Sequence, residues 1–220
     1  MIRVEDCYLK LGPKTVFYCK NFFAEPKSKI ALWGPSGCGK STLLNIISGL
    51  LRPDRGTVVV NGIDITKLSE SQLDHFRGEN IGFIFQTFNL LTPFTAIQNV
   101  IIGMRFSSTV PYSIWNKTAK SLLERVGLGN RLHNKPSQLS VGEQQRVAIA
   151  RAVANRQKII VADEPTGSLD PKTAGKVLDL LIELSNEHNV TLLLVTHDKT
   201  IADRLPILYD CSNLVREEDK

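Results

Sequence analysis

The sequence contains no long apolar run. Nowhere do about 18 apolar residues follow one another, which is the length that a membrane-spanning helix needs. Its opening, MIRVEDCYLK, carries charges and no apolar stretch, so we expect no secretory signal there. Lysine and arginine never run beyond two in a row, and the net charge of +5 is mild. Charge alone therefore gives little support to nucleic acid or an acidic membrane surface as a partner.

Cysteine is scarce and shows no pairing pattern. Cys7, Cys19, Cys38 and Cys211 form no C-x-x-C pair, and no histidine lies near them at metal-ligand spacing. A zinc site or a redox dithiol is not indicated, and a disulfide at Cys38 would block the glycine-rich loop around it. We expect reduced thiols, as is usual in a cytosolic protein. Internal repeats and low-complexity segments are absent as well.

What is present is a mixed pattern of strands and helices in 220 residues. Residues 1–33 alternate apolar and polar side chains, which predicts several strands, and 81–86 predict another. The continuous apolar runs at 158–165 and 191–198 are typical of strands buried in a parallel sheet, with 172–187 as the crossover helix. Residues 41–50 have helical spacing, and helical periodicity dominates from about 87 to 156. This order predicts an α/β protein with an all-helical insertion.

The stretch GPSGCGKST fits the pattern G-x-x-x-x-G-K-[ST] between a strand and a helix. Its glycines let backbone N–H groups turn inward around phosphate oxygens, and the following helix adds the positive end of its dipole. The lysine reaches the β- and γ-phosphates, and the serine hydroxyl ligates Mg²⁺. We predict a nucleoside triphosphate site made by Gly34, Pro35, Ser36, Gly37, Cys38, Gly39, Lys40, Ser41 and Thr42, which we call the phosphate loop.

Hydrolysis needs a carboxylate as well, and the stretch IIVADE offers two at the end of a predicted strand. Asp163 is placed to hold Mg²⁺ through its water shell. Glu164 is placed to act on a water that attacks the γ-phosphate. Neighbouring carboxylates in a loop are often only solvated, but here they follow a fully apolar strand in a chain that already carries a phosphate loop. We therefore interpret them as catalytic.

The stretch LSVGEQQR at 139–146 resembles the LSGGQ signature of the ATP-binding cassette (ABC) ATPases. Further elements of that family follow in family order: Gln86 resembles the Q-loop glutamine, Asp170 the D-loop aspartate and His197 the switch histidine. The resemblance extends over about residues 2–205. It departs from the family pattern where Val141 replaces the first signature glycine and Glu143 the glutamine.

The resemblance implies a P-loop NTPase (RecA-like) core with a parallel sheet, an N-terminal antiparallel β subdomain and an inserted α-helical subdomain. On this basis the chain is a single ABC ATPase domain, with 1–86 and 157–220 as the nucleotide-binding core and 87–156 as the helical signature subdomain. The aromatic residue that stacks on adenine in the family has no clear counterpart. Tyr8, Leu11 and Phe17 are the candidates.

The resemblance also implies an assembly, because the chain holds one phosphate loop and one signature. Two copies would enclose two ATP molecules head to tail, with Ser140 and Gly142 of one copy on the γ-phosphate of the other. Ser140 and Glu143 also fit a purely structural role, a capping box at the start of a helix, and this role is compatible with contact to the γ-phosphate. The remaining implied roles are as follows: catalytic Glu164, His197 and Gln86; Mg²⁺ ligands Ser41, Gln86 and Asp163; and Asp170 as the coupler of the two sites.

Three longer stretches, IGFIFQTFNLLTPFTAIQNV, VADEPTGSLD and LLLVTHD, most resemble the branch with lipoprotein-releasing, macrolide-efflux and cell-division ATPases. The implied function is an ATP-hydrolysing subunit that drives a separate integral membrane permease, in the cytoplasm at the inner face of the membrane. The apolar cluster of Phe88, Leu90, Leu91 and Phe94 is either core of the helical subdomain or a permease-docking surface. The alternatives are a non-transport ABC ATPase acting on nucleic acid or ribosomes, and a module that binds ATP without turnover. We expect no nucleic acid partner.

Overall fold

The computed structural model describes residues 1–106 and 109–217, which form two compact units. The first unit combines Met1–Arg77 with Thr191–Lys220, and the second is Gly78–Val190. These boundaries differ from the predicted division into a nucleotide-binding core and a signature subdomain, which stays a prediction. None of the helices in the described parts of the chain has the length and apolarity of a bilayer-crossing segment.

An antiparallel sheet forms one part of the first unit, with the strand order β10-β2-β1-β4-β5. The alternating pattern of the N-terminal segment explains it, because every second side chain of a strand faces the core. Asn61 and Gly62 join β4 to β5 with φ angles of 51° and 82°, as a tight primed turn requires. The strands are β1 (Ile2–Lys10), β2 (Thr15–Ala24), β4 (Arg55–Val60), β5 (Ile63–Asp64) and β10 (Val215–Glu217).

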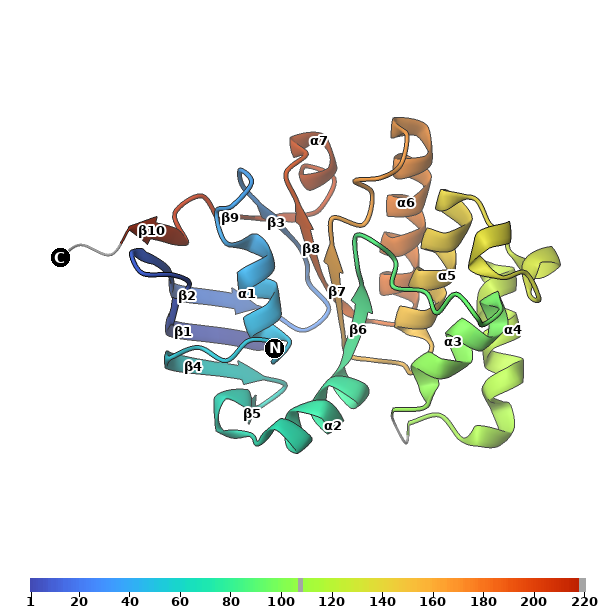
Figure 1. Ribbon diagram of the computed structural model, residues 1–220, viewed down its shortest axis with the longest axis horizontal. Helices are drawn as coiled ribbons and strands as arrows, with labels where there is room; N and C mark the ends of the chain where they lie inside the picture. The colour runs from blue at the N-terminus through green and yellow to red at the C-terminus, as the bar shows by residue number, and fades with distance from the viewer. Residues whose placement is uncertain (107–108, 218–220) are drawn as a thin grey trace. The chain divides into compact units, whose positions relative to one another are not determined.

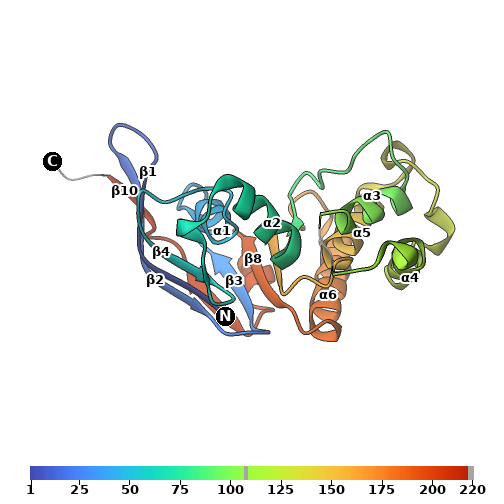
Figure 2. The same cartoon turned by 90° about the horizontal axis from the view of Figure 1, so that it is seen from below.

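Parallel strands form the other part of the first unit: β3 (Lys29–Trp33) pairs with both β8 (Thr191–Thr196) and β9 (Ile207–Asp210). All of β8 is buried, as its continuous apolar sequence predicts. Helix α1 (Lys40–Ile47) packs against β8 on one side and β4 on the other, so it lies between the two sets of strands (Figures 1 and 2). The core of this unit thus holds the helix that follows the phosphate loop.

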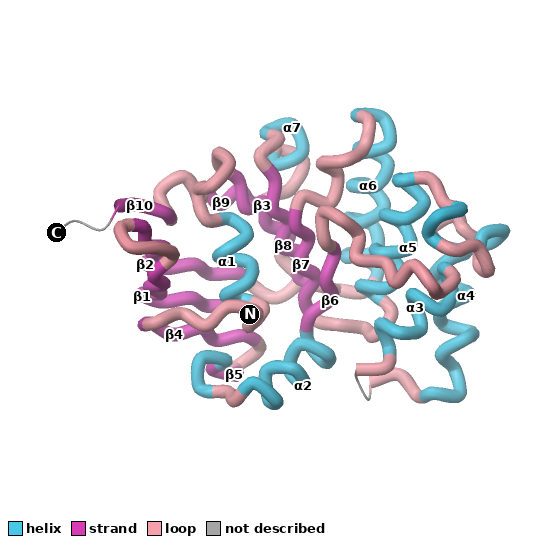
Figure 3. The backbone as a smooth tube through the Cα atoms, viewed as in Figure 1, coloured by secondary structure: helices cyan, strands magenta, loops and turns pink. Residues whose placement is uncertain are grey.

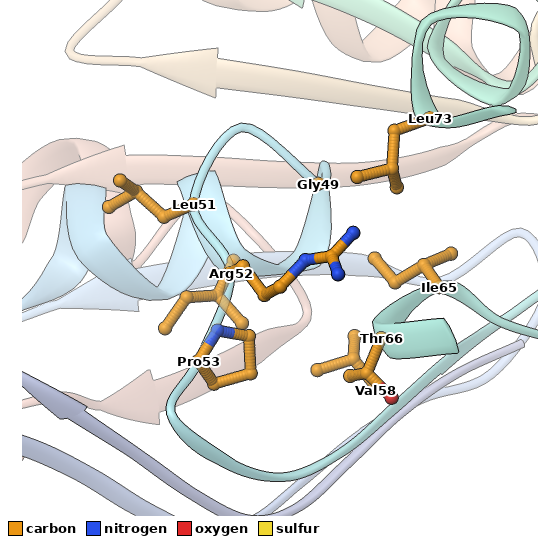
Figure 4. Close-up of a pocket in the computed structure, with 9 residues that line it drawn as sticks. Gly49, Leu51, Arg52, Pro53, Val58, Ile65, Thr66 and Leu73 are labelled. Atoms are coloured by element: carbon orange, nitrogen blue, oxygen red, sulfur yellow. The ribbon is translucent and has the colours of Figure 1, made fainter. Parts of the chain in front are cut away.

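Short helices complete the first unit. They are η1 (Ile65–Lys67), α7 (Lys199–Ala202) and α2 (Glu70–Asn80), the last of which runs on into the second unit. Around the end of α1, Gly49, Ile65 and Leu73 line a small hollow (Figure 4). Its volume of about 10 Å³ has room for one water at most. It is a packing feature and too small for a nucleotide.

The second unit is mainly helical, with strands β6 (Ile81–Ile84) and β7 (Ile159–Asp163) paired in parallel (Figure 3). Helix α5 is its centre, since it contacts α3, α4, α6 and β6. The helices are α3 (Ala96–Met104), α4 (Trp115–Arg125), α5 (Val141–Val153) and α6 (Pro171–Glu187), with short 3₁₀ turns η2 (Tyr112–Ile114), η3 (Gly129–Arg131) and η4 (Pro136–Gln138).

The predicted elements are confirmed, with ends that shift by a few residues. The helix predicted at 41–50 ends at Ile47, and the strand predicted at 158–165 is β7. All four cysteines are free and buried, and their reduced state in the cell stays a prediction. Near the C-terminus, Val215 and Arg216 pair with Phe17 and Val16 of β2, because the end of the antiparallel sheet offers them backbone partners.

Candidate functional site

The phosphate loop lies in the first unit, between β3 and α1. Gly37 and Gly39 have φ angles of 81° and 102°, a left-handed conformation that glycine adopts without steric cost. Gly39 is the residue before α1, and as a glycine it has no side chain with which to cap that helix end. The first N–H groups of α1 are therefore not capped by the residue before the helix and suit phosphate oxygens.

Lys40 is held inside this loop. Its ammonium donates to the carbonyl oxygens of Gly34 and Pro35, each at 2.8 Å, and the residue is 7% exposed. Cys38 is buried beside it, with its sulfur 4.0 Å from the Lys40 Nζ. A buried ammonium needs hydrogen-bond acceptors, and here the loop's own carbonyl oxygens provide them. Lys40 is thus pre-positioned on the loop that is predicted to bind phosphate.

The side of the loop at Gly39 packs against β2 and the C-terminal segment. A Cβ atom added to Gly39 would lie 3.1 Å from Phe17, 3.2 Å from Leu214 and 3.0 Å from Val215. A side chain there would be crowded as well as strained in its backbone angle. Phe17 is fully buried, so the structure removes it from the candidates for the adenine contact.

The other two candidates for that contact lie on or beside β1. The Tyr8 ring has the guanidinium of Arg55 5.9 Å from its centroid. Leu11 follows β1 and is 44% exposed. The adenine contact stays a prediction between these two residues.

The two predicted catalytic carboxylates lie in the second unit, at the end of β7. Asp163 is the last residue of this strand, and Glu164 follows with a φ angle of 46°. A left-handed glutamate is uncommon, and such strained backbone is concentrated at functional sites. Both side chains are half-buried. The sharp turn sends the chain away from the strand directly after Asp163.

The structure brings Gln86 close to this turn. The Gly167 N–H donates to the Glu164 carbonyl oxygen at 3.1 Å. A Cβ atom on Gly167 would lie 3.6 Å from that oxygen and 3.8 Å from the Gln86 Nε2. The amide of the predicted Q-loop glutamine and the backbone turn of the predicted catalytic glutamate thus both lie beside Gly167. Their separation in the sequence hides this proximity.

The signature residues begin α5. The Ser140 side chain accepts from the Glu143 N–H at 3.3 Å, and the Glu143 carboxylate accepts from the Ser140 N–H at 2.8 Å. This capping box confirms the structural role that the sequence suggested. The Ser140 N–H and the nearby Arg131 guanidinium hold the pKa of Glu143 below its usual range, with the backbone contact as the main cause. Glutamate in place of the family's glutamine therefore completes the cap.

The D-loop aspartate also begins a helix. Asp170 caps α6 by accepting from the Thr173 N–H at 3.1 Å, and hydrogen bonds from Thr173 lower its pKa. A Cβ atom on Gly142 would lie 2.9 Å from the Thr173 methyl group. The structure therefore brings the starts of α5 and α6 together, and Gly142 permits the close approach. His197, in the first unit, follows β8 and is exposed.

Two residues that sequence reasoning missed organise the segment after Gln86. Asn99, which is 1% exposed on α3, accepts from the Leu91 N–H and donates to the carbonyl oxygens of Leu91, Phe94 and Thr95. Arg151 of α5 donates to two further carbonyl oxygens of this segment. A charged residue within the apolar stretch RVAIARAV was the available signal for Arg151.

A magnesium site built from protein alone is not expected here. Among residues 1–106 and 109–217 there is no group of three or more acidic, histidine or cysteine side chains that could hold a metal ion. Mg²⁺ at nucleotide sites usually takes one or two protein oxygens and completes its shell with phosphates and waters. The Ser41 hydroxyl, in the first unit, and the Asp163 carboxylate, in the second, are each an oxygen donor of this kind.

The family profile described as ABC transporter matches residues 20–167. The chain belongs to the ABC transporter family. A relative named lipoprotein-releasing system ATP-binding protein LolD 1, from Rhodopseudomonas palustris, is 46% identical over 190 residues, which cover 86% of this chain and 81% of that protein. The macrolide export ATP-binding/permease protein MacB of Rhodopirellula baltica is 44% identical over 86% of this chain and 27% of its own length.

Solved ABC cassettes share the fold. The dimeric post-hydrolysis structure of the cassette MJ0796, bound to ADP and Pi, has a TM-score of 0.85 and 37% identity, and the comparison covers 100% of this chain and 98% of that one. The structure of cbiO1 from Clostridium perfringens, part of the ABC transporter complex cbiONQ, has a TM-score of 0.85 at 27% identity over 95% of this chain and 83% of its own. The predicted P-loop NTPase fold is confirmed. The chain is an ABC transporter ATPase that binds nucleotide.

Proposed function

We propose that this ATPase hydrolyses Mg-ATP as a head-to-tail homodimer and drives a separate membrane permease of the lipoprotein-releasing or macrolide-exporting branch. The observation that carries the proposal is the phosphate loop. Gly37 and Gly39 are left-handed, Gly39 has no side chain to cap the helix that follows, and Lys40 is held inside the loop. A loop so arranged is suited to a triphosphate.

Within this site the chain's own residues have separate tasks. The loop N–H groups and Lys40 bind the β- and γ-phosphates, and Ser41, Asp163 and Gln86 are the residues that would hold Mg²⁺. When bound, the metal would supply positive charge against the negative charge that develops on the phosphates. Glu164 accepts the proton of the attacking water, and His197 contacts the γ-phosphate from the end of β8. The proximity of both the Gln86 amide and the Glu164 turn to Gly167 supports a shared task for these two residues.

Dimerisation is part of the proposal because the chain has one phosphate loop and one signature. Ser140 and Gly142 would contact the γ-phosphate bound by a second copy, and Asp170 would report the state of one site to the other. The dimeric state of the solved relatives supports this assignment. Hydrolysis removes the phosphate that joins two copies, so the dimer opens and the attached permease changes state.

The permease contact is proposed at the apolar cluster of Phe88, Leu90, Leu91 and Phe94. Leu91 and Phe94 are 42% and 38% exposed, so they are not core of the helical region, which was the alternative. Asn99 ties the backbone between them in place. Exposed apolar side chains on a fixed backbone suit a docking surface. The names of the relatives LolD and MacB support the branch, and the latter name includes a permease. The protein would then lie at the inner face of the membrane.

The test is capture of the partner. Tagged Glu164→Gln protein, isolated with ATP from detergent-solubilised membranes of its own cell, should retain an integral membrane protein in about equal amount. A matched variant, Glu164→Gln with Leu91→Asp and Phe94→Asp, should still bind ATP but lose that protein. Retention of ribosomes or DNA would assign the ATPase to the non-transport class. Retention of the membrane protein by the double aspartate variant would place the docking surface elsewhere.

A further inference from the structure

The segment that follows Gln86 contains two strained residues in succession. Phe88 and Asn89 have φ angles of 61° and 46°. A left-handed conformation is unfavourable at a phenylalanine and better tolerated at an asparagine, so neighbouring contacts must hold Phe88 in particular. Within the turn, the Phe88 N–H donates to the Phe85 carbonyl oxygen at 3.0 Å, and the Asn89 N–H to that of Thr87 at 2.7 Å. These local bonds leave the carbonyl groups of both strained residues for another partner.

Arg151 is that partner. Its two terminal nitrogens donate to the carbonyl oxygens of Phe88 and Asn89, each at 2.6 Å. The planar guanidinium presents its donors in a fixed fork, so it holds two acceptors at a defined separation and angle. A lysine has one nitrogen on a flexible stem and holds no such pair. The strained turn and the arginine fork therefore fit each other.

Arg151 is itself fixed by the packing of α3 on α5. A Cβ atom on Gly103 of α3 would lie 2.8 Å from the Arg151 Cγ and 2.9 Å from its carbonyl oxygen. Asn155, one turn further along, donates to the Gly103 carbonyl oxygen at 2.6 Å. Burial lowers the pKa of Arg151 from its ordinary value, yet arginine keeps its charge in proteins. The guanidinium thus projects from a rigid base.

We propose that Arg151 is a positioning residue that joins the signature helix α5 to the segment 86–94. On one side of the clamped turn lies Gln86, with its amide beside Gly167 and the Glu164 turn. On the other side lie Leu91 and Phe94, fixed by Asn99. A displacement of α5 is transmitted through the guanidinium to both ends of the segment. This inference rests on the proposed roles of Gln86 and the apolar cluster.

The experiment replaces Arg151 by lysine, which keeps the charge, and by methionine, which keeps only the stem. Both variants are first checked for a cooperative thermal transition. Where the methionine variant fails to fold, the lysine variant carries the test. We expect kcat for ATP hydrolysis to fall on the order of tenfold, with KM for ATP within about twofold of the wild type. Arg156→Lys, an exposed arginine just beyond the same helix, is the control and should leave both constants unchanged.

The decisive readout is the coupling between Arg151 and Gln86. If Arg151 acts through Gln86, then Arg151→Lys should have little further effect on kcat in a Gln86→Ala background. Multiplicative losses in the double variant would overturn the proposal, as would a wild-type kcat in Gln86→Ala or in both Arg151 variants. Failure of the proposed function is a separate result. In that case the wild-type protein would show no hydrolysis, or Lys40→Ala would not change it.

Discussion

At the scale of single residues, the phosphate loop holds one buried positive charge, the Lys40 ammonium, in hydrogen bonds that a phosphate can replace. The Lys40 ammonium is almost completely buried, and carbonyl oxygens of its own loop satisfy it. An incoming phosphate offers a stronger, charged acceptor, so the ammonium can exchange partners at little cost in desolvation. Glu164, by contrast, is held by its backbone, since its left-handed φ sets the direction in which the chain leaves β7.

Lys40→Ala removes the charge that faces the phosphates. We expect ATP affinity to fall by at least about tenfold, from loss of a charge-assisted contact, and hydrolysis to become undetectable. Binding of a fluorescent ATP analogue and phosphate release measure the two effects. Lys14→Ala, at an exposed position in the turn before β2, is the control and should behave as wild type. Unchanged turnover in Lys40→Ala would remove the phosphate loop from its assigned role.

At the scale of elements, the first residues of α5 and α6 are alike, because at each helix start one residue has both a structural role and a proposed functional role. Ser140 and Asp170 cap their helices and are also the proposed contacts to a second copy. The Ser140 oxygen that accepts from the Glu143 N–H keeps its own O–H as a donor. The cap and the contact with γ-phosphate are thus compatible in one hydroxyl group. Because Gly142 has no side chain, the start of α5 can pack closely on α6 at Thr173.

Ser140→Asp separates these two tasks. Aspartate is as good a helix cap as serine, so the free energy of unfolding should change by less than about 1 kcal/mol. Its negative charge would repel a γ-phosphate, so ATP should still bind but no longer join two copies. Ser140→Thr keeps both the cap and a neutral hydroxyl and is the matched control. Denaturant unfolding, ATP binding and sedimentation in ATP give the three readouts. An ATP-joined dimer of Ser140→Asp would contradict the assigned contact.

At the scale of the whole molecule, one chain carries each functional element once. The phosphate loop and His197 belong to the first compact unit, and Gln86, Asp163, Glu164 and the signature belong to the second. A two-fold pair of chains doubles every element and gives two equivalent sites. The dimeric structures of close fold relatives agree with such a pair.

Glu164→Gln should accumulate in this paired state. The amide keeps the size of the carboxylate but accepts no proton, so ATP stays bound and continues to join the copies. Light scattering should show twice the monomer mass with Mg-ATP and the monomer mass with ADP. Bound nucleotide should equal two per pair. A monomer that holds ATP under the same conditions would show that nucleotide alone does not join this chain.

The phosphate loop, the capping box and the buried strand β8 could be predicted from the sequence by itself, because each depends on residues that are close together in the chain. The spacing of Gly34, Gly39 and Lys40 specifies a turn whose backbone angles are local. The capping box of Ser140 and Glu143 is a contact over one helical turn, and the apolar run of β8 requires burial on both faces. Each follows from residues near one another in the chain, where geometry leaves few alternatives.

Only the tertiary structure decided the contacts between distant residues. Nothing local to Arg151 says that its guanidinium holds the turn at Phe88 and Asn89, and nothing in the charged tail predicts that Val215 packs behind Gly39. The apolar cluster was equally compatible with core and surface until the exposure of Leu91 and Phe94 was known. Such contacts depend on which elements pack together, and side-chain type alone does not determine that, because one apolar or charged residue has many partners of suitable chemistry.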